Sequence, residues 1–480
     1  MFDLVVRSGR IVTPEGVVMG DLAVSGETIA EIGQGLGPGK EEIDATGRIV
    51  FPGVVDAHVH LGVPSKEFFS VDGMQTGTRT AVFGGVTTVI DFTVQEPGED
   101  LVASFERRRD AIAGEAHVDV ALHVNVTSFS QAALDRVPAL VERGAPSFKV
   151  FTAYGEAGMQ LGDAEILRLA DAVGRAGGLL MAHCENGDAA AFLREKAKAA
   201  RETAVRFHEA SRPDLVEAEA IHRVATLSRL AECPLYVVHL STARGLEVIR
   251  RFRGEGWTIR AETCPQYLLL DRGLYEGEDG HLYVVHPPLR TAADRAALMA
   301  AVNEGEIDVL ATDHAPFSRE QKSAAGGDFT RTPGGMPGVE TLFPLTFSRL
   351  VALGDGGLTP RSNASLLLLA RVLAENPARL FGLLPAKGVL RRGADADFLV
   401  FDPNPIRRLR TADLHGAADW CPFEDFEVRG EIRSVYLRGK RVVEGGQLHG
   451  APGDGRFVPG RIETEAPAEP VEPAEDEADD

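Results

Sequence analysis

The sequence predicts an α/β fold: a (β/α)8, TIM-like barrel with a small β-sandwich domain built from both chain ends. Three observations support this fold class. The first fifty residues alternate apolar and polar side chains, about eight apolar runs then alternate with segments of helical length, and strand-like runs return near the C-terminus. A chain of 480 residues also exceeds one ordinary core, which fits a large domain with a smaller companion.

The N-terminal elements are expected to be short antiparallel strands. Gly and Pro separate their apolar runs and mark the turns between them. These runs cover residues 4–6, 10–12, 22–24 and 29–32.

The barrel is expected to follow from Ile49, where the rhythm changes. Segments such as Asp163–Leu169 and Leu215–Leu230 carry apolar residues at helical spacing with charges opposite, and they lie between the apolar runs. This alternation is typical of a parallel sheet with covering helices. The eight expected strands are Val54–His60, Val86–Phe92, Val118–Val126, Ser147–Ala153, Gly178–Glu185, Leu235–Leu240, Thr258–Glu262 and Ile307–Asp313.

The C-terminal elements return to the small domain. Asn376 and Pro377 predict the start of a short helix, and residues 393–401 and 434–438 have strand character. We therefore expect a small β domain from residues 1–50 and 385–455 and a barrel from residues 51–384. Residues 456–480 form a tail rich in Pro and Glu with few apolar side chains, so disorder is expected there.

Charge and composition exclude several classes of partner. The net charge is −21, and the segment from Arg461 onward, with nine acids and one base, supplies −8 of it. A mildly acidic body lacks the basic surface that nucleic acid requires. No signal peptide or membrane-spanning run is evident, and the four cysteines are scattered without disulfide-like spacing. We expect a cytoplasmic protein with neither nucleic acid nor membrane as a partner.

Metal-type ligands recur at the ends of the expected strands, where barrel active sites lie. His58 and His60 are two residues apart and point to one face of their strand. His183, His239 and Asp313 follow three other strands, and this pattern predicts a metalloenzyme. The remaining histidines fit less well: His314 would be a neighbour of the site, His123 does not fit easily, and His208, His222, His415 and His449 are expected to be structural or on the surface.

Lys149 stands within an apolar run, although lysine is almost never buried without a partner. One interpretation is an ion pair with a carboxylate such as Asp313. The other is a carbamate formed from CO2, an anion able to bridge two metal ions. The residues alone leave both open.

Specific motifs extend along most of the chain. They are DAHVH, GTRTAVFGGVTTVIDF, FKVFTAY, AHCENGD, FHEASRP, PLYVVHLS, AETCPQYLLLD, PPLR, ATDHAPF, PGVETLFPL, NPARLFGL and GADADFLVFDP. From Phe2 to about Gly446 the chain resembles the cyclic amidohydrolases of the dihydropyrimidinase and D-hydantoinase family.

The resemblance implies a binuclear metal site. His58 and His60 would bind one metal ion with Asp313, His183 and His239 would bind the other, and carboxylated Lys149 would bridge both. Zinc fits a His-rich site best, and manganese or cobalt would also fit. Two such ions would activate water to open a cyclic amide or ureide ring to an N-carbamoyl amino acid. Asp313 would carry the proton to the leaving nitrogen, and Tyr154 would stabilise the oxyanion.

The resemblance also implies substrate contacts. Phe151 and Val63 would line the pocket and select ring substituents, with Tyr154 beside them. The family usually has serine where this chain has His286 and asparagine where it has Gly334, and it uses mainly main-chain groups there. Binding at these two positions can therefore survive while pocket shape differs.

Alternative functions differ in what their substrates need. Dihydroorotases place an arginine where this chain has Gly62, so that activity is disfavoured. Allantoinase is the second enzymatic hypothesis because allantoin is also a hydantoin. A non-catalytic scaffold protein of the same fold is the alternative from another class, and the six retained ligands speak against it. The resemblance further implies a homo-oligomer, a tetramer or a dimer.

Overall fold

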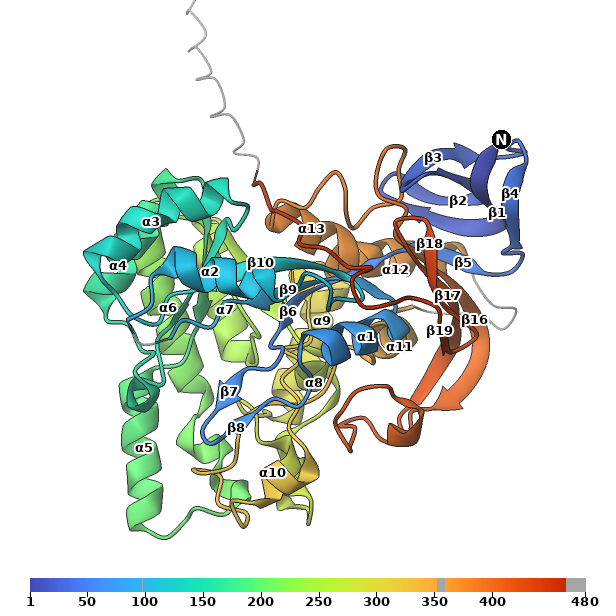
Figure 1. The fold of residues 1–480 in the computed structure, drawn as a ribbon. Coiled ribbons are helices and arrows are strands. Elements are labelled where there is room, and N and C mark those ends of the chain that lie inside the picture. Colours follow the sequence, from blue (N-terminus) through green and yellow to red (C-terminus); the bar gives the residue numbers. More distant parts are fainter. Residues whose placement is uncertain (97, 352–358, 463–480) are drawn as a thin grey trace, which may run out of the picture.

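The structure is a computed structural model that describes residues 1–96, 98–351 and 359–462. It confirms the predicted α/β barrel with a second sheet built from both chain ends (Figure 1). The barrel sheet has eight parallel strands, and neighbours in the sheet are neighbours in the sequence. The strands are β6 (Val54–Val59), β9 (Val86–Phe92), β10 (Asp119–Asn125), β11 (Ser147–Phe151), β12 (Leu179–His183), β13 (Leu235–Val237), β14 (Ile259–Thr263) and β15 (Val309–Leu310).

The first and last barrel strands are joined through side chains as well as backbone. Buried Asp56 accepts hydrogen bonds from the Thr312 backbone N–H at 3.1 Å and the Thr312 hydroxyl at 2.6 Å. The His60 backbone N–H donates to the His314 carbonyl at 2.8 Å. These bonds hold the residues after β6 and β15 next to each other.

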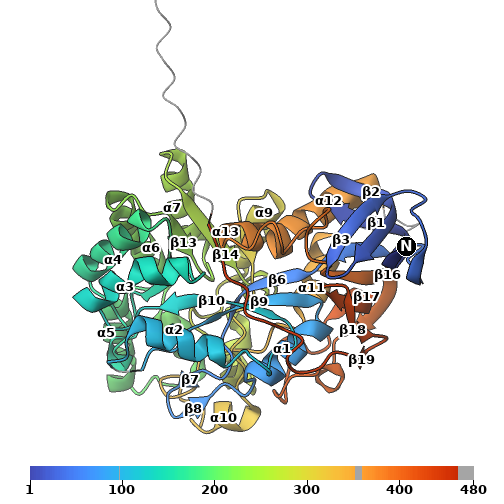
Figure 2. The same ribbon diagram turned by 45° about the horizontal axis from the view of Figure 1, so that its top comes forward.

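Helices pack around the barrel strands (Figure 2). In α4, Ile166, Leu169, Ala170 and Val173 are buried at the spacing of one helix face, and the Glu165 side chain accepts from the Gly162 N–H at the helix start. The α-helices are α1 (Met74–Phe83), α2 (Leu101–Asp110), α3 (Gln131–Glu142), α4 (Asp163–Arg175), α5 (Gly187–Ala199), α6 (Asp214–Leu230), α7 (Ala243–Gly254), α8 (Pro265–Leu269), α9 (Ala292–Asn303), α10 (Arg319–Ser323), α11 (Leu342–Leu350), α12 (Pro360–Ala370) and α13 (Asn376–Leu380). Among the described residues, none of the helices has the length and hydropathy to cross a bilayer.

The second sheet has nine strands and joins the two ends of the chain. β16 pairs antiparallel with β5, and one core contains side chains from both ends, among them Leu22 and Phe398. The expected runs at 4–6 and 10–12 form one strand, and β4 and β5 pair with it in parallel rather than antiparallel fashion. The strands are β1 (Phe2–Thr13), β2 (Gly16–Ser25), β3 (Thr28–Gly33), β4 (Gly39–Asp44), β5 (Ile49–Pro52), β16 (Phe398–Arg408), β17 (Glu427–Leu437), β18 (Lys440–Glu444) and β19 (Gln447–Leu448).

The start of the expected disordered tail is ordered, which corrects the predicted boundary at residue 456. Residues 456–461 run along the barrel, where the Val120 N–H donates to the Arg456 carbonyl and the Gly460 N–H donates to the Gly144 carbonyl. Phe457 packs edge to face on Phe105. The local sequence, GRFVPGR, does not indicate these contacts, because their partners lie in distant parts of the chain. The rest of the expected tail, residues 463–480, lies outside the described ranges.

A small hairpin follows β6 and lies close to α10 in both views (Figures 1 and 2). It consists of β7 (Pro64–Ser65) and β8 (Phe68–Phe69). At its tip, the Lys66 ammonium donates to the carbonyls of Thr330 and Thr332 at 2.9 and 2.7 Å. The hairpin is therefore fastened to the loop that contains Gly334.

Candidate metal centre

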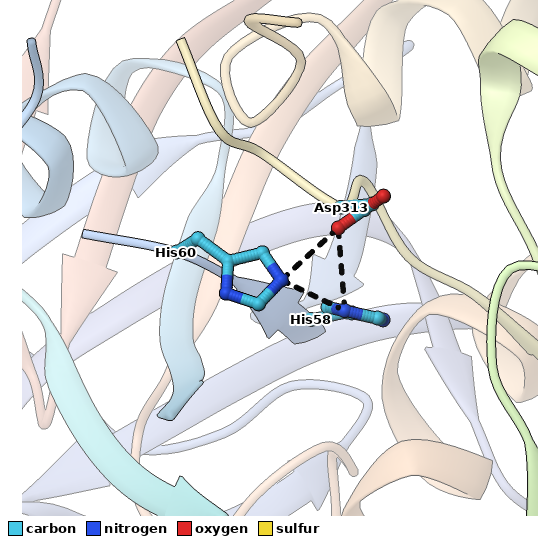
Figure 3. Close-up of side chains that lie close together, drawn as sticks. All are labelled: His58, His60 and Asp313. Carbon is cyan, nitrogen blue, oxygen red and sulfur yellow. Dashed lines mark hydrogen bonds and ion pairs between the residues drawn. The ribbon is translucent and has the colours of Figure 1, made fainter. Parts of the chain in front are cut away.

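Two histidines and an aspartate converge at the ends of β6 and β15 (Figure 3). The Nε2 atoms of His58 and His60 are 3.2 Å apart, and Asp313 Oδ1 lies 3.3 Å from the first and 3.2 Å from the second. Two imidazole nitrogens and a carboxylate oxygen at this separation form a group that could hold a metal ion.

A second pair of histidines lies beside this cluster. His183 Nδ1 and His239 Nε2 are 2.9 Å apart, and the rings of His58 and His239 have centroids 5.6 Å apart. Burial lowers the pKa of His58, His183 and His239, so these imidazoles are neutral, the form that binds metal. His239 Nδ1 is buried and has no hydrogen-bond partner within the described ranges.

Lys149 lies on β11 with 1% of its surface exposed. Its Nζ is 5.1 Å from the centroid of Phe92 and 5.2 Å from that of Phe151, and Phe92 in turn stacks on His60. No ion pair or hydrogen bond joins Nζ to another residue in the described part of the chain, so the ion pair with Asp313, one of the two interpretations of Lys149, is not formed. Burial lowers the pKa of Lys149 to about 8, which brings the neutral amine within reach near physiological pH.

Two buried carboxylates orient the histidines. Glu262 accepts from His58 Nδ1 at 2.8 Å and from the His239 backbone N–H at 3.0 Å, while Glu185 contacts His183 Nε2 at 2.8 Å. Each contact occupies one ring nitrogen and leaves the other directed at the cluster. Sequence reasoning did not assign a role to either carboxylate, although Glu185 follows His183 by two residues and Glu262 ends an expected strand.

Arg212 is a further residue that sequence reasoning missed. Its guanidinium lies 2.5 Å from Glu185 and 5.5 Å from the centroid of Tyr154. Burial would raise the pKa of Glu185, but Arg212 and His183 lower it to about 2, so the carboxylate stays charged. The FHEASRP motif contains Arg212, but nothing local in that motif indicates its partner.

Tyr154 follows β11 and packs on the second histidine pair. Its ring centroid lies 4.9 Å from that of His183 and 6.0 Å from that of Phe151. Burial raises the pKa of Tyr154 well above its usual value, so the hydroxyl remains a hydrogen-bond donor. Val63 lies at the base of the β7–β8 hairpin, where its N–H donates to the Ser70 hydroxyl and that hydroxyl donates to the His60 carbonyl.

The two departures from the family pattern lie in contact. His286 has its ring centroid 5.9 Å from Tyr154, and a Cβ placed on Gly334 would be 2.6 Å from its Nδ1. The structure thus brings His286 and Gly334 together beside Tyr154.

Four other histidines have structural partners. His123 contacts the Ser147 hydroxyl and the Ala57 carbonyl, and His314 Nδ1 accepts from the Gly338 N–H. His208 is buried with its Nε2 at the Val285 carbonyl, and His415 contacts Glu340.

A second group of acids, Asp119, Asp395 and Asp397, is also close enough to hold a cation. The Lys387 ammonium already pairs with all three carboxylates. This group is therefore an internal ion-pair network.

The donor set of the main cluster fits divalent metal. Ring nitrogens of two histidine pairs face one another, and a carboxylate oxygen lies at the first pair, so cations would satisfy these donor atoms. Lys149 lies close to these residues, and its positive charge contributes to the lowered pKa of His58, His183 and His239.

Comparisons with known proteins agree with this site. The profile of the amidohydrolase family matches residues 49–442. A D-phenylhydantoinase of Escherichia coli (strain SE11) is 38% identical over 460 residues, which is 95% of this chain and 97% of that protein. A D-hydantoinase crystal structure superimposes with a TM-score of 0.90 at 36% identity, covering 95% of this chain and 98% of that one. A dihydropyrimidinase from Brevibacillus agri gives a TM-score of 0.91 at 33% identity, covering 96% and 99%.

These matches confirm the resemblance predicted from the motifs. Both the profile and the relatives extend over the barrel and its cluster of histidines. The chain belongs to the amidohydrolase family.

Proposed function

We propose that this protein is a binuclear metal-dependent hydrolase that opens hydantoin or dihydropyrimidine rings to N-carbamoyl amino acids. The observation that carries the proposal is the convergence of His58, His60 and Asp313 next to His183 and His239. Relatives named D-phenylhydantoinase and dihydropyrimidinase support the substrate class.

Two divalent ions, zinc in the first place, would be held by the two histidine groups. When bound, they supply Lewis acidity and water of lowered pKa, so a nucleophile exists at neutral pH. We propose that Lys149 is carboxylated, because its buried amine has no partner within the described ranges and CO2 would convert it to an anion with release of a proton. An anion at this place would stabilise two cations that an ammonium would repel.

Asp313 is proposed to carry the proton. Burial would raise its pKa, but His58 and His60 lower it, so the carboxylate is available as a general base. It would accept the proton of the attacking water and return it to the ring nitrogen as the C–N bond breaks.

Tyr154 is proposed to stabilise the oxyanion. Its protonated hydroxyl makes no hydrogen bond with another residue in the described ranges, so it is free to donate to the substrate carbonyl oxygen. Phe151 packs on Tyr154, and Phe151 and Val63 are proposed to contact the ring substituent. The main chain at His286 and Gly334 is proposed to hold the amide groups of the ring.

The first experiment measures ring opening. Zinc-loaded protein is incubated with hydantoin, 5-phenylhydantoin, dihydrouracil, allantoin and dihydroorotate, and open-chain product is followed. We expect turnover of the first three rings. Turnover of allantoin alone would replace the proposal with allantoinase, and no turnover despite two bound metal ions would contradict a cyclic amidase.

The second experiment measures metal. Wild type is expected to bind two ions per chain, and Lys149→Ala is expected to retain fewer and to lose most activity. The control is Lys198→Ala, which removes an exposed lysine that pairs with Glu195 far along α5. A wild type without bound metal would favour the scaffold hypothesis.

The homo-oligomer and the cytoplasmic location stay predictions. Light scattering coupled to size-exclusion chromatography would distinguish a dimer from a tetramer.

A further inference from the structure

The imidazole of His286 lies against the backbone of Gly334. A Cβ at position 334 would be 2.6 Å from Nδ1, 2.8 Å from Cε1 and 3.4 Å from Cγ of that ring. Gly334 is not in the left-handed region, so alanine would carry no backbone strain there, and the three nearest atoms that its Cβ would meet all belong to the imidazole. The ring therefore occupies the space that a side chain at 334 would fill.

The His286 ring is also connected to the metal centre through contacts between aromatic rings. Its centroid is 5.9 Å from Tyr154, and Tyr154 is 4.9 Å from the candidate ligand His183. His208 lies behind it at 5.2 Å. Tyr154 and His208 therefore limit the space into which a ring displaced from Gly334 could move.

The backbone on either side of His286 is firmly held. The Val284 carbonyl accepts from the Gly335 N–H at 3.1 Å and from the buried Lys322 ammonium at 2.7 Å. The Val285 carbonyl meets His208 Nε2 at 2.9 Å, and the Pro287 carbonyl accepts from the Tyr267 hydroxyl at 2.6 Å. The segment cannot move back to relieve a clash without breaking these bonds.

The His286 side chain is half-buried and polar at its edge. Burial, together with the nearby charge of Arg212, lowers its pKa well below the usual value, so the ring is neutral. No residue in the described ranges forms a hydrogen bond with either ring nitrogen. The ring remains available to contact a bound molecule.

We propose that His286 and Gly334 act as a coupled pair that sets the width of the substrate pocket beside Tyr154 and so determines which ring substituents are accepted. The imidazole forms one side of the pocket, and the absence of a side chain at Gly334 leaves the space that the imidazole occupies. This inference rests on the proposed ring-opening activity and deepens it.

The test is a double-mutant cycle read as the ratio of kcat/KM for 5-phenylhydantoin to that for hydantoin. His286→Ser removes the imidazole and is expected to raise this ratio about tenfold. Gly334→Ala pushes the imidazole toward Tyr154 and is expected to lower the ratio about tenfold. In the His286→Ser background, Gly334→Ala is expected to change the ratio by less than about twofold, because nothing is left to displace.

His281→Ser is the matched control. His281 is a histidine of the same segment whose Nε2 contacts Ser323, away from these ring contacts, and its replacement should leave the ratio unchanged. Metal content and melting temperature are measured for every variant. If Gly334→Ala alone does not fold, the double variant is expected to fold, and its melting temperature then demonstrates the coupling between the two residues.

The outcomes separate the two levels of inference. If the wild type opens none of the rings, the proposed function itself is contradicted. An active wild type in which Gly334→Ala has equal effects with and without the imidazole overturns the coupling. An active His286→Ser variant that treats both substrates as the wild type does overturns the role in specificity.

Discussion

Three residues of the candidate site leave their strands in the left-handed region of backbone space. Tyr154, His239 and Asp313 have φ of 69°, 38° and 52°. Each such conformation costs about 1–3 kcal/mol in a non-glycine residue and persists where the surroundings fix it. Those surroundings include the Glu262 carboxylate at the His239 N–H, so strain and function coincide at the same residues.

Replacing Tyr154 by phenylalanine should affect chemistry more than binding. Tyr154→Phe keeps the packing on His183 and Arg212 but removes the hydroxyl. We expect kcat to fall about 100-fold with little change in KM, since the donor acts on charge that develops in the transition state. Steady-state kinetics at unchanged metal content would test this. A fall in kcat of less than threefold would show that the hydroxyl is not the oxyanion donor.

Glu262→Gln should weaken metal binding. The carboxylate accepts from His58 Nδ1, the His239 N–H and the Tyr236 hydroxyl, and an amide cannot accept all three. We expect metal affinity to fall about 10- to 100-fold, measured by competition with a chelator. Tyr236→Phe removes one donor and keeps the carboxylate, so it should lower metal affinity less than Glu262→Gln does. Equal affinities in Glu262→Gln and wild type would exclude an orienting role.

At the scale of the element, Lys66 joins the tip of the β7–β8 hairpin to the loop of Thr330 and Thr332. Lys66→Met keeps the alkyl chain but removes two hydrogen bonds to the carbonyls of Thr330 and Thr332. Hydrogen bonds from a charged donor contribute about 1.5 kcal/mol or more, so amide exchange across residues 61–70 should be at least about tenfold faster. Lys40→Met, which breaks an exposed pair with Asp3, is the control. Unchanged exchange would mean that other contacts hold the hairpin.

The strands could be predicted because each is a short buried run followed by polar residues. β9, for example, runs from Val86 to Phe92 as expected. The ends were less predictable: β15 is only Val309–Leu310, and Asp313 lies in the irregular segment after it, with a φ of 52° rather than strand geometry. Periodicity records burial but not the backbone conformation of a single residue.

The candidate site was predictable as a set of residue types but not as a network. The spacing of His58 and His60 identifies them as a ligand pair, whereas Glu262, which contacts His58, is 204 positions away in the chain. The contact of His286 with Gly334 likewise depends on two loops meeting in space. Such partners are fixed by the closed barrel, which local pattern does not encode.

At the scale of the whole molecule, a buried ion-pair network joins the barrel to the second sheet. Lys387 contacts Asp119, the first residue of β10, and Asp397, which precedes β16. The carboxylates raise the pKa of Lys387 despite its burial, so it stays charged. The network explains why these acids can be buried at the junction.

Lys387→Met should destabilise the protein strongly because it leaves buried carboxylates uncompensated. We expect the free energy of unfolding, measured with urea, to fall by about 3–5 kcal/mol. Lys440→Met breaks a pair with Asp454 in which the lysine is largely exposed, and it should cost about 1 kcal/mol or less. Similar losses in the two variants would contradict the special role of the buried lysine.

The pairing of β5 with β16 has a consequence for how the chain is made. Val50 lies opposite Val400, so partners in one sheet are separated by the whole barrel sequence. During synthesis β5 leaves the ribosome long before β16 exists, and the core that the two chain ends share stays incomplete meanwhile. Completion of this sheet is therefore a late event, which can follow only after the entire barrel has been translated.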